Sequence, residues 1–335
     1  MGASRSRKFT GFQLMAALAG FDSTVCVRRR NEEVLEAALV QGTTQVWALF
    51  RGEADRECFS IDPYALKQAP LKLPVRFKVG DYARIQDAAG LLLTSIVEPG
   101  IEWKWPDDED RVLRLPSDLI EGVLRAARVA SDYAPYSHIR FRLKEKQAEV
   151  MGTDGSVLVL TRRDLEEPIS VDFEIRAREA YHFARFAKKA GKKSTFHVAL
   201  GENFADLSVS VPDWMVVVRA PQSERRDVPF EIIETVNFPT RFGKVRVRHA
   251  KTELKTAETR WRVWMVASDD GYVHFTQEQP DEGEPFAFRP RKFLTLLRAF
   301  PASAEAEVLL NEEKQFVKLV AGEIEGWTRP IAEEV

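Results

Sequence analysis

The sequence has few cysteines and few histidines, and this scarcity excludes several kinds of site. Among 335 residues there are only two cysteines, Cys26 and Cys58, which cannot build a disulfide framework and do not have the spacing of metal ligands. We therefore expect a reducing, cytoplasmic environment. The five histidines are scattered, with no HExxH motif and no Cys/His cluster, so the sequence predicts no metal site and no cofactor.

Long apolar runs and enzyme motifs are also missing. No apolar stretch approaches the roughly 20 residues that a membrane-spanning helix needs, so we expect no membrane partner. The sequence has no GxxxxGK[ST], GxSxG or GxGxxG motif. The acidic residues Asp269 and Asp270 precede Gly271, and acids beside glycine commonly serve a turn. We predict no catalytic residues and no enzymatic activity, while a metal-dependent DNA-processing enzyme that uses this acidic pair stays open as an alternative.

An excess of charge of one sign is absent as well. The chain has 49 Lys and Arg against 51 Asp and Glu, a formal net charge of −2. Proteins that bind nucleic acid usually carry an excess of positive charge. The total therefore argues against a nucleic-acid partner unless positive residues are concentrated on particular faces.

What the sequence does have is a repeated order of elements: a strand, a helix and then three strands. The predicted helices are Phe12–Phe21, Asp62–Ala69, Ser117–Ser131, Arg176–Ala190 and Arg289–Phe300. The strands around the middle two helices are His138–Leu143, Ala148–Thr153, Val157–Thr161, Val171–Ile175, Thr195–Leu200, Asp206–Val211 and Met215–Arg219. The remaining predicted strands are Phe59–Ile61, Val75–Val79, Ala83–Asp87, Leu91–Ile96, Phe286–Phe288, Ala306–Leu310, Phe316–Val320 and Ile324–Trp327.

Two further half-units are weaker, Phe9–Arg51 and Phe230–Gln279, and in the second Pro239 is predicted to interrupt the expected helix. Six half-units of about 56 residues account for the 335 residues. Proline and charge clusters at Pro99–Pro116 and Ala220–Pro229 mark linkers. The sequence thus predicts an α+β protein with three domains, at residues 1–105, 112–222 and 228–335.

Three domains, each a doubled βαβββ unit, resemble the DNA sliding clamps of bacteria. The segment Met151–Leu158 is similar to the A-T-D-G-H-R-L stretch of that family, and Phe288–Pro330 is similar to its closing half-domain. Ala220–Val228 resembles the segment that joins the second and third domains, and the pattern covers most of residues 59–335 and, only loosely, residues 1–58. The resemblance implies a clamp fold whose helices line the inside of a ring while antiparallel sheets lie outside.

The resemblance also implies a function and partners. The chain would encircle double-stranded DNA without reading its sequence, as a head-to-tail homodimer, and would tether DNA polymerase and other replication or repair proteins. A separate clamp loader would place it on DNA. A partner-peptide pocket would be formed by Thr153, Gly155, Leu158, Pro221, Val228, Pro330 and Ile331. The alternative is a clamp-fold paralogue that acts as a protein-interaction module without encircling DNA.

A DNA-encircling surface requires basic residues on helix faces opposite the core, and two predicted helices have them. In Arg176–Ala190 the apolar residues fall on one side and the basic residues on the other, and no acid occurs from Arg185 to Lys193. The alternative is an ordinary solvated face. The predicted DNA-binding residues are Arg125, Arg128, Arg178, His182, Arg185, Lys188, Lys189, Lys192, Lys193, Arg291, Lys292 and Arg298.

Overall fold

The structure, a computed structural model, divides the chain into two compact units. Unit 1 comprises Met1–Ile120 and Phe173–Glu224, and unit 2 comprises Glu121–Asp172 and Arg225–Val335. The structure describes residues 11–19, 23–41, 44–68, 71–98, 111–131, 136–190, 194–201, 204–211, 214–221, 235–280, 286–311, 313 and 315–331. None of the helices in these ranges is long and apolar enough to cross a membrane.

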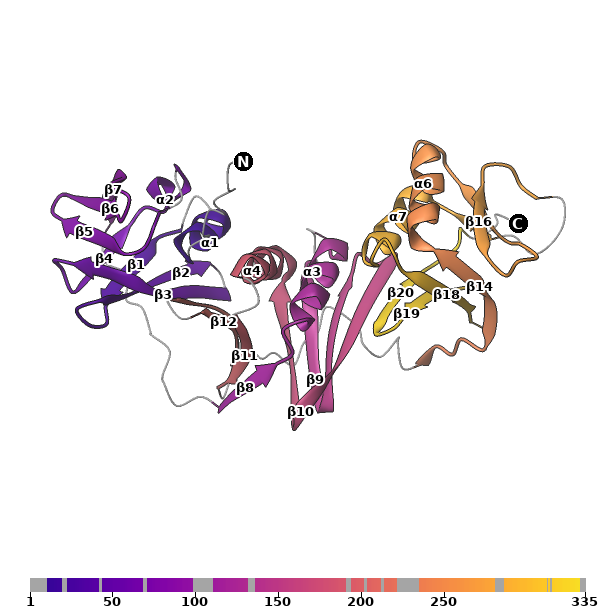
Figure 1. Cartoon of the computed structure of the whole chain (residues 1–335), viewed down its shortest axis with the longest axis horizontal. Helices are drawn as coiled ribbons and strands as arrows, with labels where there is room; N and C mark the ends of the chain where they lie inside the picture. The colour runs from indigo at the N-terminus through magenta and orange to yellow at the C-terminus, as the bar shows by residue number, and fades with distance from the viewer. Residues whose placement is uncertain are drawn as a thin grey trace, which may run out of the picture. The chain divides into compact units, whose positions relative to one another are not determined.

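Unit 1 is built on an eleven-stranded sheet with the order β2-β1-β4-β7-β6-β5-β3-β13-β12-β11-β8 (Figure 1). Its strands are β1 (Val25–Arg29), β2 (Val34–Gln41), β3 (Thr44–Ala54), β4 (Cys58–Ile61), β5 (Val75–Val79), β6 (Tyr82–Asp87), β7 (Leu92–Glu98), β8 (Arg111–Leu115), β11 (Thr195–Leu200), β12 (Phe204–Val211) and β13 (Trp214–Pro221). Because β2 also pairs with β3, the first seven strands form a closed cycle of pairings. Only the β3–β5 pairing is parallel among the pairings described in this unit.

The helices of unit 1 cover this sheet with their apolar faces. They are α1 (Gly11–Leu18), α2 (Tyr64–Gln68) and α4 (Ala177–Ala190). The helix α1 contacts α2, α4 and the strands β2, β3 and β13, and Leu14, Met15 and Leu18 are almost completely buried there. An apolar helix of this kind packs inside because burying its side chains is its main source of stability.

Unit 2 contains a six-stranded sheet, β14-β18-β19-β20-β10-β9, and a three-stranded sheet, β16-β15-β17. The strands of the larger sheet are β9 (His138–Thr153), β10 (Val157–Arg176), β14 (Thr240–Arg246), β18 (Glu305–Leu310), β19 (Val317–Ala321) and β20 (Ile324–Thr328). Those of the smaller sheet are β15 (Val263–Ala267), β16 (Val273–Thr276) and β17 (Phe286–Phe288). The helices are α3 (Leu119–Val129), α6 (Val247–Thr256) and α7 (Pro290–Arg298).

Glycines in the strands let two helices of unit 2 approach the sheet closely. A Cβ atom added to Gly152 of β9 would lie 2.2 Å from the backbone oxygen of Ala126 in α3. A Cβ atom on Gly326 of β20 would lie 2.3 Å from Cδ1 of Leu296 in α7. A side chain at position 152 would collide with the backbone of α3, so glycine is required there, whereas at position 326 the side chains of Leu296 and Phe300 would have to move.

A chain of ion pairs crosses the larger sheet of unit 2. Glu149 of β9 is only 5% exposed and lies 2.5 Å from the Arg142 guanidinium and 2.8 Å from Nε of Arg162 in β10. Arg162 also contacts the Glu325 carboxylate of β20, which lies 2.8 Å from Nζ of Lys318 in β19. Neighbouring opposite charges compensate the loss of water around these largely buried groups.

The predicted order of elements is confirmed in the closing half-unit, where β17, α7, β18, β19 and β20 follow each other as expected. The prediction that Pro239 interrupts a helix is wrong. Pro239 lies before β14, and α6 forms downstream of it with Val247, Ala250 and Leu254 buried at helical spacing. The first helix ends at Leu18.

In two cases, two predicted strands belong to one longer strand of the structure. The predicted strands His138–Leu143 and Ala148–Thr153 belong to β9, and Val157–Thr161 and Val171–Ile175 belong to β10. The Arg142–Glu149 ion pair shows that β9 reverses direction, because residues seven apart in a straight strand are about 23 Å apart. The division of the chain into three domains stays a prediction, since residues 112–222 contribute to both compact units.

We expect the Arg162→Met variant, which keeps the aliphatic stem, to lower the free energy of unfolding by about 1–3 kcal/mol. The reason is that the largely buried Glu149 and Glu325 each lose a charged partner. Urea unfolding followed by circular dichroism measures the change.

The matched control is Arg76→Met, because Arg76 and its partner Glu53 are 68% and 60% exposed. Exposed pairs contribute little, so we expect this variant to differ from the parent by no more than about 0.5 kcal/mol. Equal losses in the two variants would contradict a stabilising role for the ion-pair chain.

Candidate functional site

The helix α4 carries a basic face opposite its buried face, as the sequence predicts. Ala180, Phe183, Ala184 and Ala187 are at most 1% exposed. On the other side the predicted DNA-binding residues Arg178, Arg185, Lys188 and Lys189 are all exposed. The described helix spans Ala177–Ala190. The predicted residues Lys192 and Lys193 lie outside the described residues.

Contacts within unit 1 fix part of this basic face. Arg178 donates a hydrogen bond from its guanidinium to the backbone oxygen of Ala17 in α1, at 3.3 Å. The Arg185 guanidinium lies 5.5 Å from the centre of the Tyr181 ring. Burial lowers the pKa of His182 below its ordinary value, and the positive charges of Arg178 and Arg185 lower it further. His182 is therefore uncharged at neutral pH, and the arginines and lysines carry the charge.

The predicted residues of α3 and α7 lie in different surroundings. Arg125 of α3 is half-buried and Arg128 is exposed. In α7, Arg291 and Arg298 are exposed, opposite the buried Phe293, Leu296 and Leu297. Lys292 does not lie free on this face, because its Nζ is 2.7 Å from Oδ2 of Asp154.

The helix α6 adds basic residues that the sequence analysis missed. Arg248 and Lys255 are exposed and Lys251 is half-buried, and all three flank the buried face of Val247, Ala250 and Leu254. Burial lowers the pKa of Lys251, and the nearby charges of Arg298 and Lys255 lower it further. The packed helices α6 and α7 thus bring like charges together. The helical spacing of Val247, Ala250 and Leu254 was the signal that could have predicted this face.

The segment Thr153–Gly155 forms the tight turn that its sequence predicts. Oδ1 of Asp154 accepts hydrogen bonds from the backbone nitrogens of Ser156 and Val157, both at 2.8 Å. Thr153 donates its hydroxyl to the Val157 backbone oxygen at 2.8 Å. Gly155 has a φ of +84°, the left-handed conformation that favours glycine. The ion pair with Lys292 attaches this turn to α7.

An apolar cluster lies beside this turn in unit 2. Leu158, 8% exposed, packs with Met151, Leu160 and Trp327, and Val236 and Phe238 lie against them. Leu158 is opposite Trp327 in the β10–β20 register, and the rings of Trp327 and Phe238 are 4.6 Å apart at 72°. The cluster is thus well packed by the chain's own side chains, and Leu158 is the most exposed of its four buried members.

For the other residues of the predicted peptide pocket, the structure gives fewer contacts. Pro330 and Ile331 are both half-buried just beyond β20. The backbone nitrogen of Ile331 donates to the backbone oxygen of Ala287 in β17 at 2.7 Å, which directs the chain toward the smaller sheet. Pro221 ends β13 in unit 1, and Val228 lies outside the described residues. The pocket therefore stays a prediction.

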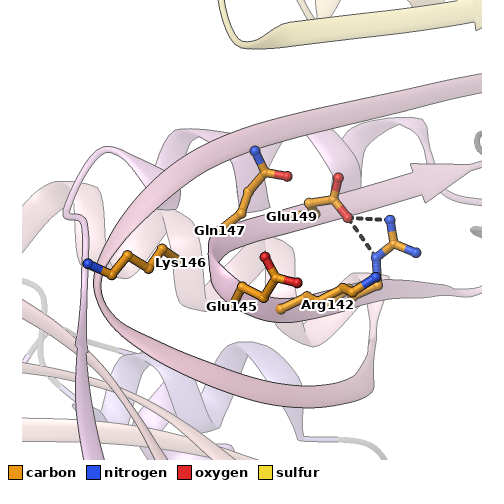
Figure 2. A pocket seen from close by; sticks show the side chains of 6 residues that line it. Arg142, Glu145, Lys146, Gln147 and Glu149 are labelled. Carbon is orange, nitrogen blue, oxygen red and sulfur yellow. Dashed lines mark hydrogen bonds and ion pairs between the residues drawn. The ribbon is translucent and has the colours of Figure 1, made fainter.

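A polar hollow of about 400 Å³ lies at the turn of β9. Figure 2 shows the chain bending around it, with Glu145, Lys146 and Gln147 near the bend and Arg142 paired to Glu149. Charged and polar side chains of this single strand form its lining. Binding sites for small molecules and peptides are usually more apolar, so this hollow is a weaker candidate than the turn beside Leu158.

The acidic pair of the enzymatic alternative serves a turn. Oδ1 of Asp270 accepts hydrogen bonds from the Ser268 hydroxyl at 2.5 Å and from the Tyr272 backbone nitrogen at 3.1 Å. The Ser268 hydrogen bond is the main reason that the pKa of Asp270 is lowered. Gly271 has a φ of +78° in this turn. Two of the scattered histidines, His249 and His274, come together beside Glu253.

The order of the elements and their packing define a class of protein: the chain has the fold of the DNA sliding clamps. It is similar to the DNA polymerase III beta subunit of Thermotoga maritima, with a TM-score of 0.72 at 15% identity over 97% of this chain and 98% of that one. It is also similar to the Helicobacter pylori beta clamp bound to a DNA ligase peptide, with a TM-score of 0.67 at 12% identity over 97% and 99% of the two chains.

The DNA polymerase sliding clamp of Bacillus subtilis gives a TM-score of 0.70 at 12% identity over 96% of each chain. No protein-family model and no curated protein matches the sequence. The likeness in fold confirms the α+β clamp architecture that the resemblance in sequence implied.

We expect the His182 imidazole to titrate below its ordinary pKa of 6.5, because the folded state disfavours its charged form. The unfolded chain then binds the proton more readily, so this residue lowers stability as the pH falls below about 6.5. NMR titration of the imidazole measures the pKa, and Arg185→Ala should raise it toward the ordinary value. A midpoint at or above 6.5 in the parent protein would contradict the electrostatic description of α4.

Proposed function

We propose that this chain is a DNA sliding clamp, a processivity factor that encircles duplex DNA and tethers a polymerase to it. The fold supports the proposal, because it is shared with bacterial beta clamps along nearly the whole chain. In this role the protein has no catalytic chemistry of its own and needs no cofactor. A separate ATP-driven loader opens the ring and closes it around DNA.

The observation that carries the proposal is the separation of basic and apolar residues on the helices. Exposed cations lie opposite a buried face on α4 and on α7, and exposed Arg248 and Lys255 flank the buried face of α6. Phosphates attract such residues regardless of base sequence, and the attraction weakens as salt rises because bound counterions are released. Long, flexible side chains can contact phosphates while the DNA slides past.

Near-neutral charge is compatible with this role. A closed ring stays on DNA by topology, so it does not need the strong binding that a large positive excess provides. Heterologous contacts close into a ring when the rotation between subunits returns to the start. We propose a head-to-tail homodimer as the assembly.

The partner site in this proposal lies at the Thr153–Gly155 turn and the chain beyond β20, where Pro330 and Ile331 follow. Leu158 and Trp327 provide an apolar base for an extended segment of a polymerase, a loader or a repair protein. The Helicobacter pylori clamp of similar fold is bound to a DNA ligase peptide, which supports a peptide as the kind of ligand.

We expect the charge reversal Arg185→Glu with Lys189→Glu to weaken association with duplex DNA. Losing two phosphate contacts should also lower the slope of log affinity against log salt by about 1.8. Fluorescence anisotropy of a labelled duplex, measured over a series of salt concentrations, gives both quantities.

The matched control is Lys78→Glu with Arg84→Glu, which changes the net charge by the same amount. These two exposed residues face each other across β5 and β6, on a sheet rather than a helix. We expect DNA affinity close to that of the parent protein. Equal affinity and equal slope in the two double variants would contradict a helix-lined DNA surface.

The ring itself is tested by DNA topology. We expect a particle with twice the mass of the chain, and after loading we expect it to remain on closed circular DNA and to leave the same DNA once it is linearised. Mass photometry and gel filtration of the DNA complexes provide the measurements. A monomer that treats both DNA forms alike would favour the alternative, a clamp-fold module that binds only protein.

A further inference from the structure

Two histidines and a glutamate converge between α6 and β16 in unit 2. His249 and Glu253 lie four residues apart on α6, and His274 lies on β16. Oε1 of Glu253 is 3.2 Å from Nε2 of His249 and 3.5 Å from Nδ1 of His274. The three potential ligand atoms all lie within 4.8 Å of one another.

This spacing matches the first coordination shell of a small transition-metal ion. Zinc binds histidine nitrogen at about 2.0–2.1 Å with tetrahedral geometry, so neighbouring ligand atoms are about 3.3 Å apart. The two distances from Glu253 are close to that value, and the wider gap between the histidines can close by side-chain rotation, because His249 is 64% exposed. We propose that His249, Glu253 and His274 bind one divalent transition-metal ion, for which zinc is the best fit.

The donor types decide the class of ion. Imidazole nitrogens suit zinc, copper, nickel and cobalt, whereas magnesium and calcium prefer sites made of oxygen atoms. Two nitrogens and one carboxylate oxygen therefore select against the two abundant alkaline-earth ions. His274 is 43% exposed, so water completes the fourth position from the open side.

A backbone contact orients the carboxylate toward the histidines. Oε2 of Glu253 accepts a hydrogen bond from the backbone nitrogen of Phe275 at 3.3 Å. Phe275 is 9% exposed, and its ring lies 4.9 Å from that of Phe293, so this backbone is held by the core. Groups that fix a metal ligand in this way typically strengthen metal binding.

The bound ion has a structural consequence. It links α6 to β16, an edge strand of the three-stranded sheet, and it stabilises the folded state in proportion to the logarithm of metal concentration over the dissociation constant. If no ion binds, the same three groups form only hydrogen bonds among themselves, and the stability of the folded state does not depend on metal concentration.

The test uses the full-length chain without an affinity tag, stripped with a chelator and then dialysed. Titration calorimetry with Zn²⁺ should show one ion bound per chain, and Co²⁺ should develop the visible absorption of a low-symmetry nitrogen and oxygen site. His249→Gln, His274→Gln and Glu253→Gln should each weaken Zn²⁺ binding at least about tenfold. The control His138→Gln changes a half-exposed histidine of β9 and should leave binding unchanged.

Three results would overturn the proposal: no saturable Zn²⁺ uptake by the parent chain, parent-like affinity in both histidine variants, or Mg²⁺ binding as tight as Zn²⁺ binding. Both histidines are exposed enough for the metal-free variants to fold, and their melting temperatures without metal should equal that of the parent. Added Zn²⁺ should raise the melting temperature of the parent and the His138→Gln control but not that of the other variants.

Discussion

The pairing of β10 with β20 is the constraint on which unit 2 depends. In this register Val159 lies opposite Gly326 and Leu158 opposite Trp327, so a slip of one residue would turn Arg162 to the other face and leave Glu149 and Glu325 without it. The same register gives α7 its close approach at Gly326 and places Leu158 in the apolar cluster with Trp327. Strand pairing, helix packing and the proposed peptide site therefore share one alignment.

The helices satisfy two demands at once. In α4 and α7 the buried face holds the helix on its sheet, and the opposite face carries arginine and lysine. The depressed pKa values of His182 and Lys251 have the same physical origin, because each group is partly buried beside like charges. Such crowding costs stability in the free protein, and in the proposed function the phosphates of DNA would relieve it. A net charge of −2 hides this separation.

The sequence predictions succeeded where the signal came from residues close together in the sequence, and they failed where it depended on distant residues. The closing half-unit was predicted element by element because Pro290 starts α7 and its apolar residues recur at helical spacing. The helix α6 was missed because Pro239 was taken to lie within it, although Pro239 lies before β14. Lys292 was assigned to DNA from its helix face, but it pairs with Asp154, 138 residues away in sequence. No periodicity could have predicted that contact.

The sequence by itself determined most of the order of strands and helices, the turns at Gly155 and Gly271, and the apolar and basic faces of α4 and α7. These features depend on residues within a few positions of one another, and the periods of helix and strand make them readable. Only the tertiary structure decided which side chains from distant segments meet: Glu149 with Arg162 and Glu325, Leu158 with Trp327, and His274 with His249 and Glu253. Those contacts depend on strand register and helix packing, which are determined by the packing of the whole core.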